Sequence, residues 1–240
     1  MRISWGAAAG RAVTGRPAPG PRRRTAAASS ADAVVLDLPF RGSWRVENSP
    51  ARRVPSHGTE AFGSSHAIDF VAVDAGGRSA PRTWRGLAAA EPPELFRGFG
   101  APILAPVTGT VVLAHDEEPD HEARRSPLTL VPYMLGQAGR ARGGVAALAG
   151  NHVVVAVGPG GPFVVLAHLR HGSVQVRPGQ RLRVGAVLAE CGNSGNSTQP
   201  HVHVQVSDST DWHRAHGVPL AFRDRTGRTW VPAESEVVRA

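Results

Sequence analysis

Short runs rich in valine, isoleucine and leucine recur along the chain, and each is only long enough for one β-strand. β-Branched residues favour a pleated sheet, whereas glycine and proline, present 28 and 20 times, favour turns. The runs are Val34–Leu38, Ala67–Val73, Gly109–Ala114, His152–Val157, Phe163–Leu169, Arg183–Ala189 and His201–Val206. The turn residues Gly158–Pro162 between two of these runs predict a hairpin. This spacing predicts a mainly β fold with antiparallel pairing.

Composition divides the chain into three parts. Residues 1–32, rich in Ala, Gly, Pro, Ser and Arg, predict a disordered basic tail. Residues 33–222 are expected to form one β domain, followed by a C-terminal extension at 223–240. The strand pattern is interrupted at about 74–101 and 115–150, which predicts two long loop insertions, the second with room for a short helix.

The charge balance argues against a nucleic-acid partner. The formal net charge is +8 and all 27 basic residues are arginine, but six of them lie in the tail beside the single acid Asp32. The rest of the chain is close to neutral, and no aromatic residues alternate with a basic stripe. No apolar run approaches the roughly 20 residues of a membrane span. The lone Cys191 excludes an intramolecular disulfide.

The strand His201–Val206 carries the chemistry. Side chains alternate between the two faces of a strand, so His201, His203 and Gln205 share one face while the valines pack into the core. Two imidazoles about 7 Å apart on one face can serve one site. The small polar run Cys191–Pro200 leads into this strand and allows close approach of a ligand to the backbone.

Two further polar residues lie in apolar runs. His168 closes the run Phe163–Leu169, and Asp69 lies inside Ala67–Val73. A buried carboxylate is unfavourable unless it is paired or bound to a cation. One ionised aspartate with several neutral histidines is typical of a zinc site.

The order of these elements resembles the lysostaphin/LytM-type zinc metallopeptidases, whose fold is a β-sheet or sandwich. That family carries an HxxxD element, a Tyr-x-His-Leu element and a Gly-x-(Ser/Thr)-Gly-x-(Ser/Thr)-Thr-Gly-Pro-His-Leu-His element. This chain has Asp69, then Ala167-His168-Leu169, then the run from Gly192 to His203. Residues 105–111 are similar to the family's Pro-x-x-Gly-x-Val strand turn. The match spans about residues 55–208, with long insertions.

The resemblance implies that Asp69 and His203 are zinc ligands and that His168 and His201 are the flanking catalytic histidines. The family places another ligand histidine four residues before Asp69, where this chain has Ser65. Two replacements remain open. His66 lies one position after Ser65, and a shift of one residue along a strand turns a side chain to the opposite face. His57, twelve residues upstream in a turn-like segment, is the favoured third ligand.

The implied function is zinc-dependent hydrolysis of a peptide bond, with peptidoglycan peptide as the substrate. One alternative is a non-catalytic peptidoglycan-binding or regulatory module, which Ser65 favours. Another is a histidine phosphocarrier; a biotinyl or lipoyl carrier is excluded because the chain has no lysine. No secretory signal is visible, which by itself predicts the cytoplasm. The resemblance instead implies the cell envelope or the outside of the cell, if the start site is misassigned. The sequence leaves the oligomeric state undetermined.

Overall fold

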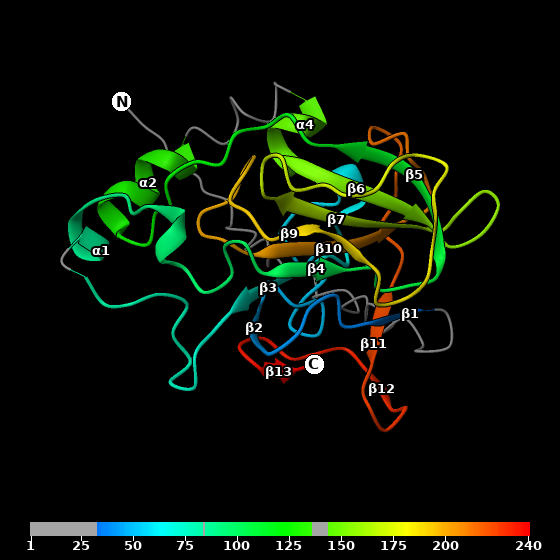
Figure 1. Cartoon of the computed structure of the whole chain (residues 1–240), viewed down its shortest axis with the longest axis horizontal. Helices are drawn as coiled ribbons and strands as arrows, with labels where there is room; N and C mark the ends of the chain where they lie inside the picture. Colours follow the sequence, from blue (N-terminus) through cyan, green and yellow to red (C-terminus); the bar gives the residue numbers. More distant parts are fainter. Residues whose placement is uncertain (1–32, 84, 136–143) are drawn as a thin grey trace, which may run out of the picture.

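A computed structural model describes residues 33–83, 85–135 and 144–240, so the predicted tail at 1–32 lies outside the described residues (Figure 1). The strands are β1 (Val34–Asp37), β2 (Ser43–Glu47), β3 (Ile68–Ala72), β4 (Pro102–Leu104), β5 (Gly109–His115), β6 (Asn151–Ala156), β7 (Phe163–Leu169), β8 (Arg181–Leu182), β9 (Val187–Glu190), β10 (Val202–Ser207), β11 (Leu220–Arg223), β12 (Thr229–Trp230) and β13 (Val237–Arg239). The helices are α1 (Arg85–Ala88), α2 (Pro127–Leu135) and α4 (Gly144–Ala149), with short 3-10 turns at Ala61–Gly63 and Pro93–Leu95.

An 8-stranded sheet in the order β13-β2-β3-β10-β7-β6-β5-β8 forms the body of the molecule. Every pairing in it is antiparallel. A 3-stranded sheet, β1-β11-β12, and a 2-stranded sheet, β4-β9, accompany it. The hairpin predicted at residues 158–162 joins β6 to β7. The mainly β, antiparallel fold expected from the sequence is therefore confirmed; β1 and β11 form a parallel pair.

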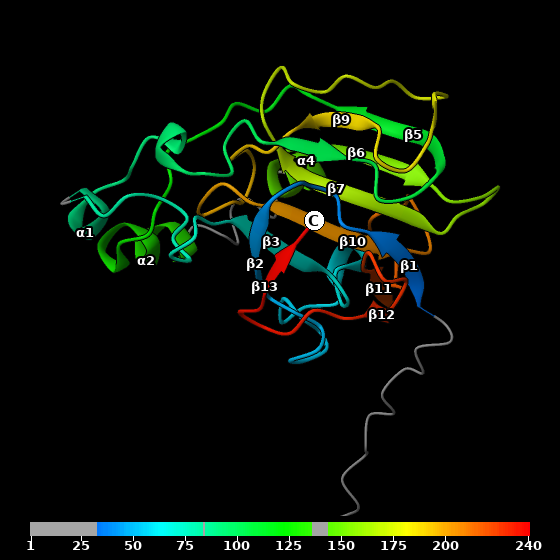
Figure 2. The same cartoon turned by 60° about the horizontal axis from the view of Figure 1, so that its bottom comes forward.

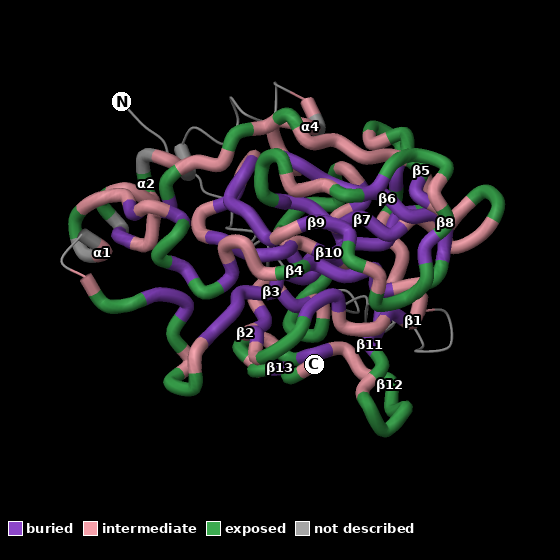
Figure 3. Tube along the Cα trace, in the orientation of Figure 1, coloured by how far each residue is buried: buried purple, intermediate pink, exposed green. Residues whose placement is uncertain are grey.

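One hydrophobic core is shared by all three sheets. Val204 of the main sheet, Phe222 of the 3-stranded sheet and Leu188 of the 2-stranded sheet belong to the same buried cluster. Figure 3 shows the buried trace concentrated along the central strands and the exposed trace at the peripheral turns. Valine, leucine and alanine supply most of this core. In β10 the packing of Val202, Val204 and Val206 into the core fixes which face of the strand is buried there, and the opposite face carries polar side chains.

The prediction of one strand over Arg183–Ala189 was wrong, because only the second half of this run lies in a strand, β9. Gly185 has φ +82°, a left-handed conformation that favours glycine, and the chain turns there. β8 ends before this turn and pairs with β5, whereas β9 follows it and pairs with β4. The short strands β2, β4, β8, β11, β12 and β13 were not predicted. β13 lies in residues 223–240 and pairs with β2 at the edge of the main sheet.

Both insertions contain helices, and a buried ion pair joins them. α1 lies within 74–101, while α2 and α4 lie within 115–150, where a short helix was expected. Glu91, fully buried, accepts hydrogen bonds from the Arg125 guanidinium at 2.6 and 2.7 Å. Figures 1 and 2 show α1 and α2 together at one end of the main sheet. Over the described residues, no helix has the length and apolarity needed to cross a membrane.

Candidate metal centre and catalytic pocket

The site is built on one face of the central strands. In the antiparallel ladder His203 of β10 lies opposite Asp69 of β3 on one side and opposite Ala167 of β7 on the other. Directly opposed residues in such a ladder project from the same face. His201, His203 and Gln205 all line one pocket, while the valines between them are fully buried in the core. The alternation predicted for this strand is therefore confirmed.

His168 enters the same pocket through a β-bulge. Along β7 the side chains alternate until Ala167, and simple alternation would turn His168 into the core. The ladder between β6 and β7 shifts register here, so that Ala167 and His168 together lie opposite His152. His168 has φ +60°, a conformation that histidine rarely adopts. The bulge places Ala167 and His168 both in the pocket lining and returns Leu169 to the core.

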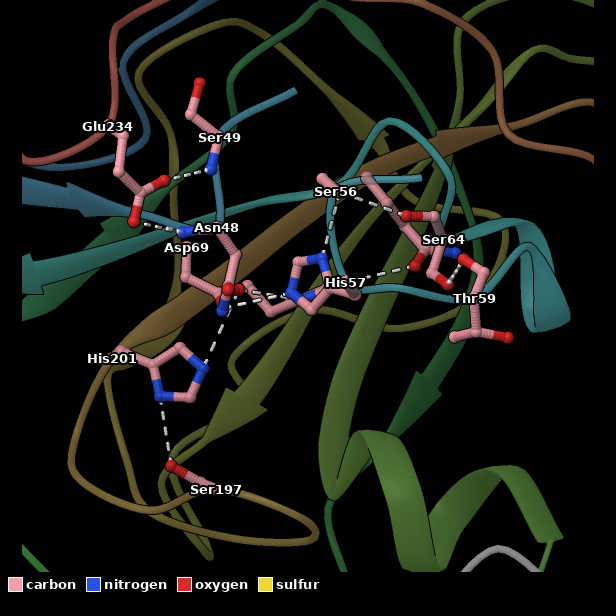
Figure 4. Close-up of polar contacts among 12 residues, drawn as sticks. Asn48, Ser49, Ser56, His57, Thr59, Ser64, Asp69, Ser197, His201 and Glu234 are labelled. Atoms are coloured by element: carbon pink, nitrogen blue, oxygen red, sulfur yellow. Dashed lines mark hydrogen bonds and ion pairs between the residues drawn. The ribbon is translucent and has the colours of Figure 1, made fainter. Parts of the chain in front are cut away.

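The Asp69 carboxylate is the centre of the polar network (Figure 4). Only 5% of the residue is exposed. Its Oδ1 lies 2.9 Å from His203 Nδ1 and 3.8 Å from His201 Nε2. Its Oδ2 lies 3.0 Å from His57 Nε2 and accepts a 2.8 Å hydrogen bond from Asn48 Nδ2. Burial opposes ionisation, but the surrounding histidines outweigh it and hold the pKa of Asp69 well below its usual range.

His57 reaches the site from the segment between β2 and β3. Its ring lies against that of His203, with centroids 4.9 Å apart. His57, Asp69 and His203 each offer one ligand atom, and these atoms all lie within 4.8 Å of one another. His66 does not belong to this group, and it does not line the pocket. The structure thus brings together the three residues predicted as metal ligands and leaves the alternative outside.

The hydrogen bonds of His203 are compatible with a cation at Asp69. Gln205 Nε2 donates to the Phe62 carbonyl at 2.9 Å, which orients the amide so that Oε1 faces His203 Nε2 at 2.9 Å. The Nε2 proton of His203 is therefore donated to Gln205, and a neutral ring presents its Nδ1 lone pair to the Asp69 oxygen. Two acceptors 2.9 Å apart require a second proton or a metal ion between them. Asp69 raises the pKa of His203 against the effect of burial.

The hydrogen bonds of His57 lead to the same conclusion. Ser56 Oγ lies 3.0 Å from His57 Nδ1 and 3.4 Å from the Ser64 carbonyl, so that a hydroxyl that donates to Ser64 would accept the Nδ1 proton of His57 and leave the Nε2 lone pair facing Asp69. Metal-binding histidines commonly donate their other ring proton to a polar neighbour in this way. A tetrahedral zinc site with bonds of about 2.1 Å places its ligand atoms about 3.4 Å apart. The two imidazoles and one carboxylate therefore suit a zinc ion.

His168 and His201 are held differently. Their Nδ1 atoms donate to backbone carbonyls, His168 to Ser194 at 2.9 Å and His201 to Gln199 at 2.8 Å. Both rings consequently keep Nε2 free for a ligand, and their centroids are 4.6 Å apart. Burial, followed by the nearby charges of His201 and His203, lowers the pKa of His168 well below its usual range, so that its ring is neutral at pH 7. Two imidazoles beside a metal centre are suited to proton transfer.

These residues line a pocket of about 780 Å³. The second insertion contributes to its wall through Leu130 of α2 and through Leu148 and Ala149 of α4. The sequence did not indicate Asn48 or Trp212, which also line it. The sequence did hold one signal for Asn48. It directly follows an apolar–polar alternation typical of a strand, and asparagine is one of the residues that can end a strand in a left-handed conformation such as the φ of +54° found here.

Comparison with known proteins finds one family model that matches part of the chain. Residues 136–215 match the model of peptidase family M23. His168, His201 and His203 lie inside this segment, whereas His57 and Asp69 lie before it. This match agrees with the resemblance to lysostaphin/LytM-type peptidases, and residues 136–215 are called the M23 peptidase segment below. No curated protein matches the chain.

Several solved structures are similar. A mutant catalytic domain of the prophage-encoded M23 protein EnpA from Enterococcus faecalis is 17% identical, covers 65% of this chain and 75% of its own, and has a TM-score of 0.36. The catalytic domain of lysostaphin from Staphylococcus simulans is 17% identical, with coverages of 66% and 80% and a TM-score of 0.36. Csd3 from Helicobacter pylori is 16% identical, with coverages of 72% and 30% and a TM-score of 0.36.

The choice between His57 and His66 can be tested by removing each ring. We expect His57→Ala to lose bound metal, because its Nε2 lies 3.0 Å from Asp69 Oδ2, and His66→Ala to retain it. The measurement is the metal content of each purified variant, determined by elemental mass spectrometry after exhaustive dialysis. The two variants are matched in volume and charge, so each is the control for the other. Metal loss confined to His66→Ala would reverse the assignment.

Proposed function

We propose that this chain is a zinc-dependent endopeptidase that hydrolyses peptide bonds in peptidoglycan. The observation that carries the proposal is the convergence of two imidazole nitrogens on the buried Asp69 carboxylate, at 3.0 and 2.9 Å. Beside that centre, His168 and His201 present free Nε2 atoms to the same pocket. The M23 peptidase segment supports the reaction class, and the family resemblance supports peptidoglycan as the substrate. A peptidoglycan substrate implies that the protein acts at the cell envelope.

The three groups His57, Asp69 and His203 hold the ion. Bound zinc supplies Lewis-acid chemistry, which acidifies water and polarises a carbonyl group. Gln205 fixes the His203 ring through the Nε2 hydrogen bond, so that Nδ1 remains directed at the metal position.

His168 and His201 move the protons. One of the two Nε2 atoms accepts a proton from the attacking water, and the other donates one to the leaving amine. Protonated imidazole also stabilises the negative charge that develops on the carbonyl oxygen. The Ser194 and Gln199 carbonyls hold both rings in the tautomer that leaves Nε2 available. The two rings are symmetric in this respect, and hydrogen bonding alone does not divide the two roles between them.

The test is metal analysis combined with a cleavage assay on the purified chain. We expect about one zinc per chain and release of new amino termini from purified peptidoglycan. Removal of the metal with a chelator should abolish release, and added zinc should restore it. Zinc binding without cleavage across a broad panel of peptidoglycans would favour the non-catalytic module. A chain that retains no metal and accepts phosphate on histidine would favour the phosphocarrier.

A further inference from the structure

A second, shallower pocket adjoins the first. Its volume is about 480 Å³, and it shares Leu130 and Thr198 with the lining of the metal-centre pocket. The charged residues that line it are Arg45, Arg78, Arg82, Arg124, Arg125 and Glu47. We call this cavity the arginine pocket. Its lining comes from β2, from the loop after β3, from the segment that precedes α2 and from the loop before His201.

The arginine pocket has an excess of positive charge that nearby carboxylates only partly neutralise. Arg45 pairs with Glu47 at 2.8 Å, and Arg125 pairs with the buried Glu91 at 2.6 Å. The other three arginines, Arg78, Arg82 and Arg124, form no ion pair within the described part of the chain. The charge of Arg78 nevertheless acts on the nearby Asp74 carboxylate. Guanidinium groups that gather in a concave surface without carboxylate partners make a favourable site for an anion.

Part of the pocket is preorganised. The Arg124 guanidinium stacks on the Tyr133 ring at 4.7 Å and donates to the Glu122 carbonyl at 2.7 Å. Arg45 donates to the Gly77 carbonyl at 3.0 Å, which ties the loop after β3 to the sheet. The planar guanidinium fork matches the two oxygens of a carboxylate. A ligand that binds here therefore meets Arg45 and Arg124 already held in place.

The arginine pocket lies next to the metal centre. Glu47 lies directly opposite Asp69 in the β2–β3 ladder. Thr198 belongs to the loop that leads into His201, and its carbonyl accepts the backbone N–H of Arg124 at 2.7 Å. A peptide with its scissile bond at the metal centre therefore needs only a short extension past Thr198 to reach the guanidinium groups.

We propose that the arginine pocket is a specificity subsite that binds a carboxylate carried by the substrate peptide near the scissile bond. The proposal rests on the proposed function, since it assigns the substrate class of the same site. Acidic peptides and peptides with a free α-carboxylate fit the pocket, whereas the corresponding amides lack the charge. A phosphate group would meet the same donors, so the experiment must distinguish the two anions.

The experiment compares two forms of one substrate. Peptidoglycan is first stripped of phosphate-bearing wall polymers, and half is then treated with carbodiimide and ammonia to convert its carboxylates to amides. We expect the zinc-loaded wild type to cleave the free-carboxylate form about tenfold faster at limiting substrate, the size of one charge-assisted hydrogen bond. In Arg78→Ala/Arg82→Ala this ratio should fall to about one.

The matched control is Arg223→Ala/Arg225→Ala, which removes the same charge from two exposed arginines at β11 and the turn after it. It should keep the wild-type ratio. Equal cleavage of both substrate forms by the wild type would overturn the subsite and leave the endopeptidase function standing. A ratio that falls equally in both double variants would also overturn it, because general charge would then explain the preference.

A binding measurement separates failure of the subsite from failure of catalysis. The zinc-loaded protein is sedimented with each insoluble substrate form. If nothing is cleaved but the wild type binds the free-carboxylate form more tightly, and Arg78→Ala/Arg82→Ala does not, the subsite is supported and hydrolysis is not. Equal binding of the two forms would overturn the subsite. A preference that appears only on unstripped material, which retains wall phosphates, would assign the pocket to phosphate and overturn the carboxylate proposal.

Discussion

Asp69→Ala should reduce the zinc content of the purified chain from about one per molecule to nearly none. The Asp69 carboxylate lies within 3.0 Å of both imidazoles of the predicted ligand set and is the only anionic group in that set. Its loss removes one ligand and the negative charge that the ion would neutralise. Zinc content after dialysis is the measurement, with thermal melting to verify that the variant folds.

Two further variants sharpen this experiment. Asp69→Asn keeps the volume of the side chain and loses only its charge, so it should also lose zinc. Glu117→Gln makes the same change at an exposed carboxylate in the charged run after β5 and should retain full occupancy. Full occupancy in both Asp69 variants would remove the proposed metal centre, whatever the activity of the wild type.

His168→Ala and His201→Ala should each keep zinc and lose peptidoglycan hydrolysis by about 10²- to 10⁴-fold, the usual contribution of a positioned acid or base. Neither ring belongs to the ligand set, and both present a free Nε2 to the pocket. Removing either ring eliminates one proton transfer without removing a ligand. The measurement is the release of amino termini from peptidoglycan, alongside zinc content and melting temperature.

The matched control for this pair is His171→Ala, which removes an exposed imidazole in the turn after β7. It should keep near-wild-type rates. If the wild type cleaves and both His168→Ala and His201→Ala retain near-normal rates, these rings do not transfer protons in the reaction. If either variant loses its zinc, that ring acts through the metal centre instead.

Strand periodicity made much of the fold and part of the site predictable. Alternation along β10 predicted that His201, His203 and Gln205 would share a face, and packing of the intervening valines enforces this arrangement. The carboxylate of Asp69 inside an apolar run was likewise informative, since burying it requires a partner. Both inferences use only residues that are close in the sequence and lie on one strand, where the backbone geometry is regular.

What could not be predicted depends on contacts between distant segments. His57 was favoured as a ligand because His66 lies one position out of register, but the way in which the segment between β2 and β3 carries His57 to Asp69 could not be predicted, since that segment has no periodicity. The arginine pocket combines side chains from β2, from the loop after β3 and from the segment before α2. Because those segments are far apart in the chain, composition alone could not show that their arginines converge.

The bulge in β7 shows that one extra residue can add a proposed catalytic side chain to a strand whose other residues only pack the sheet. Before the bulge, β7 alternates between core and pocket as any sheet strand does, and after it Leu169 resumes the core position. A chain shortened by one residue at this point could keep its hydrogen-bonded ladder and its apolar packing, yet would have no imidazole where His168 now lies. Deletions that leave the stability of the sheet unchanged can therefore remove chemistry completely, and tolerance to substitution in this strand gives no measure of its tolerance to changes in length.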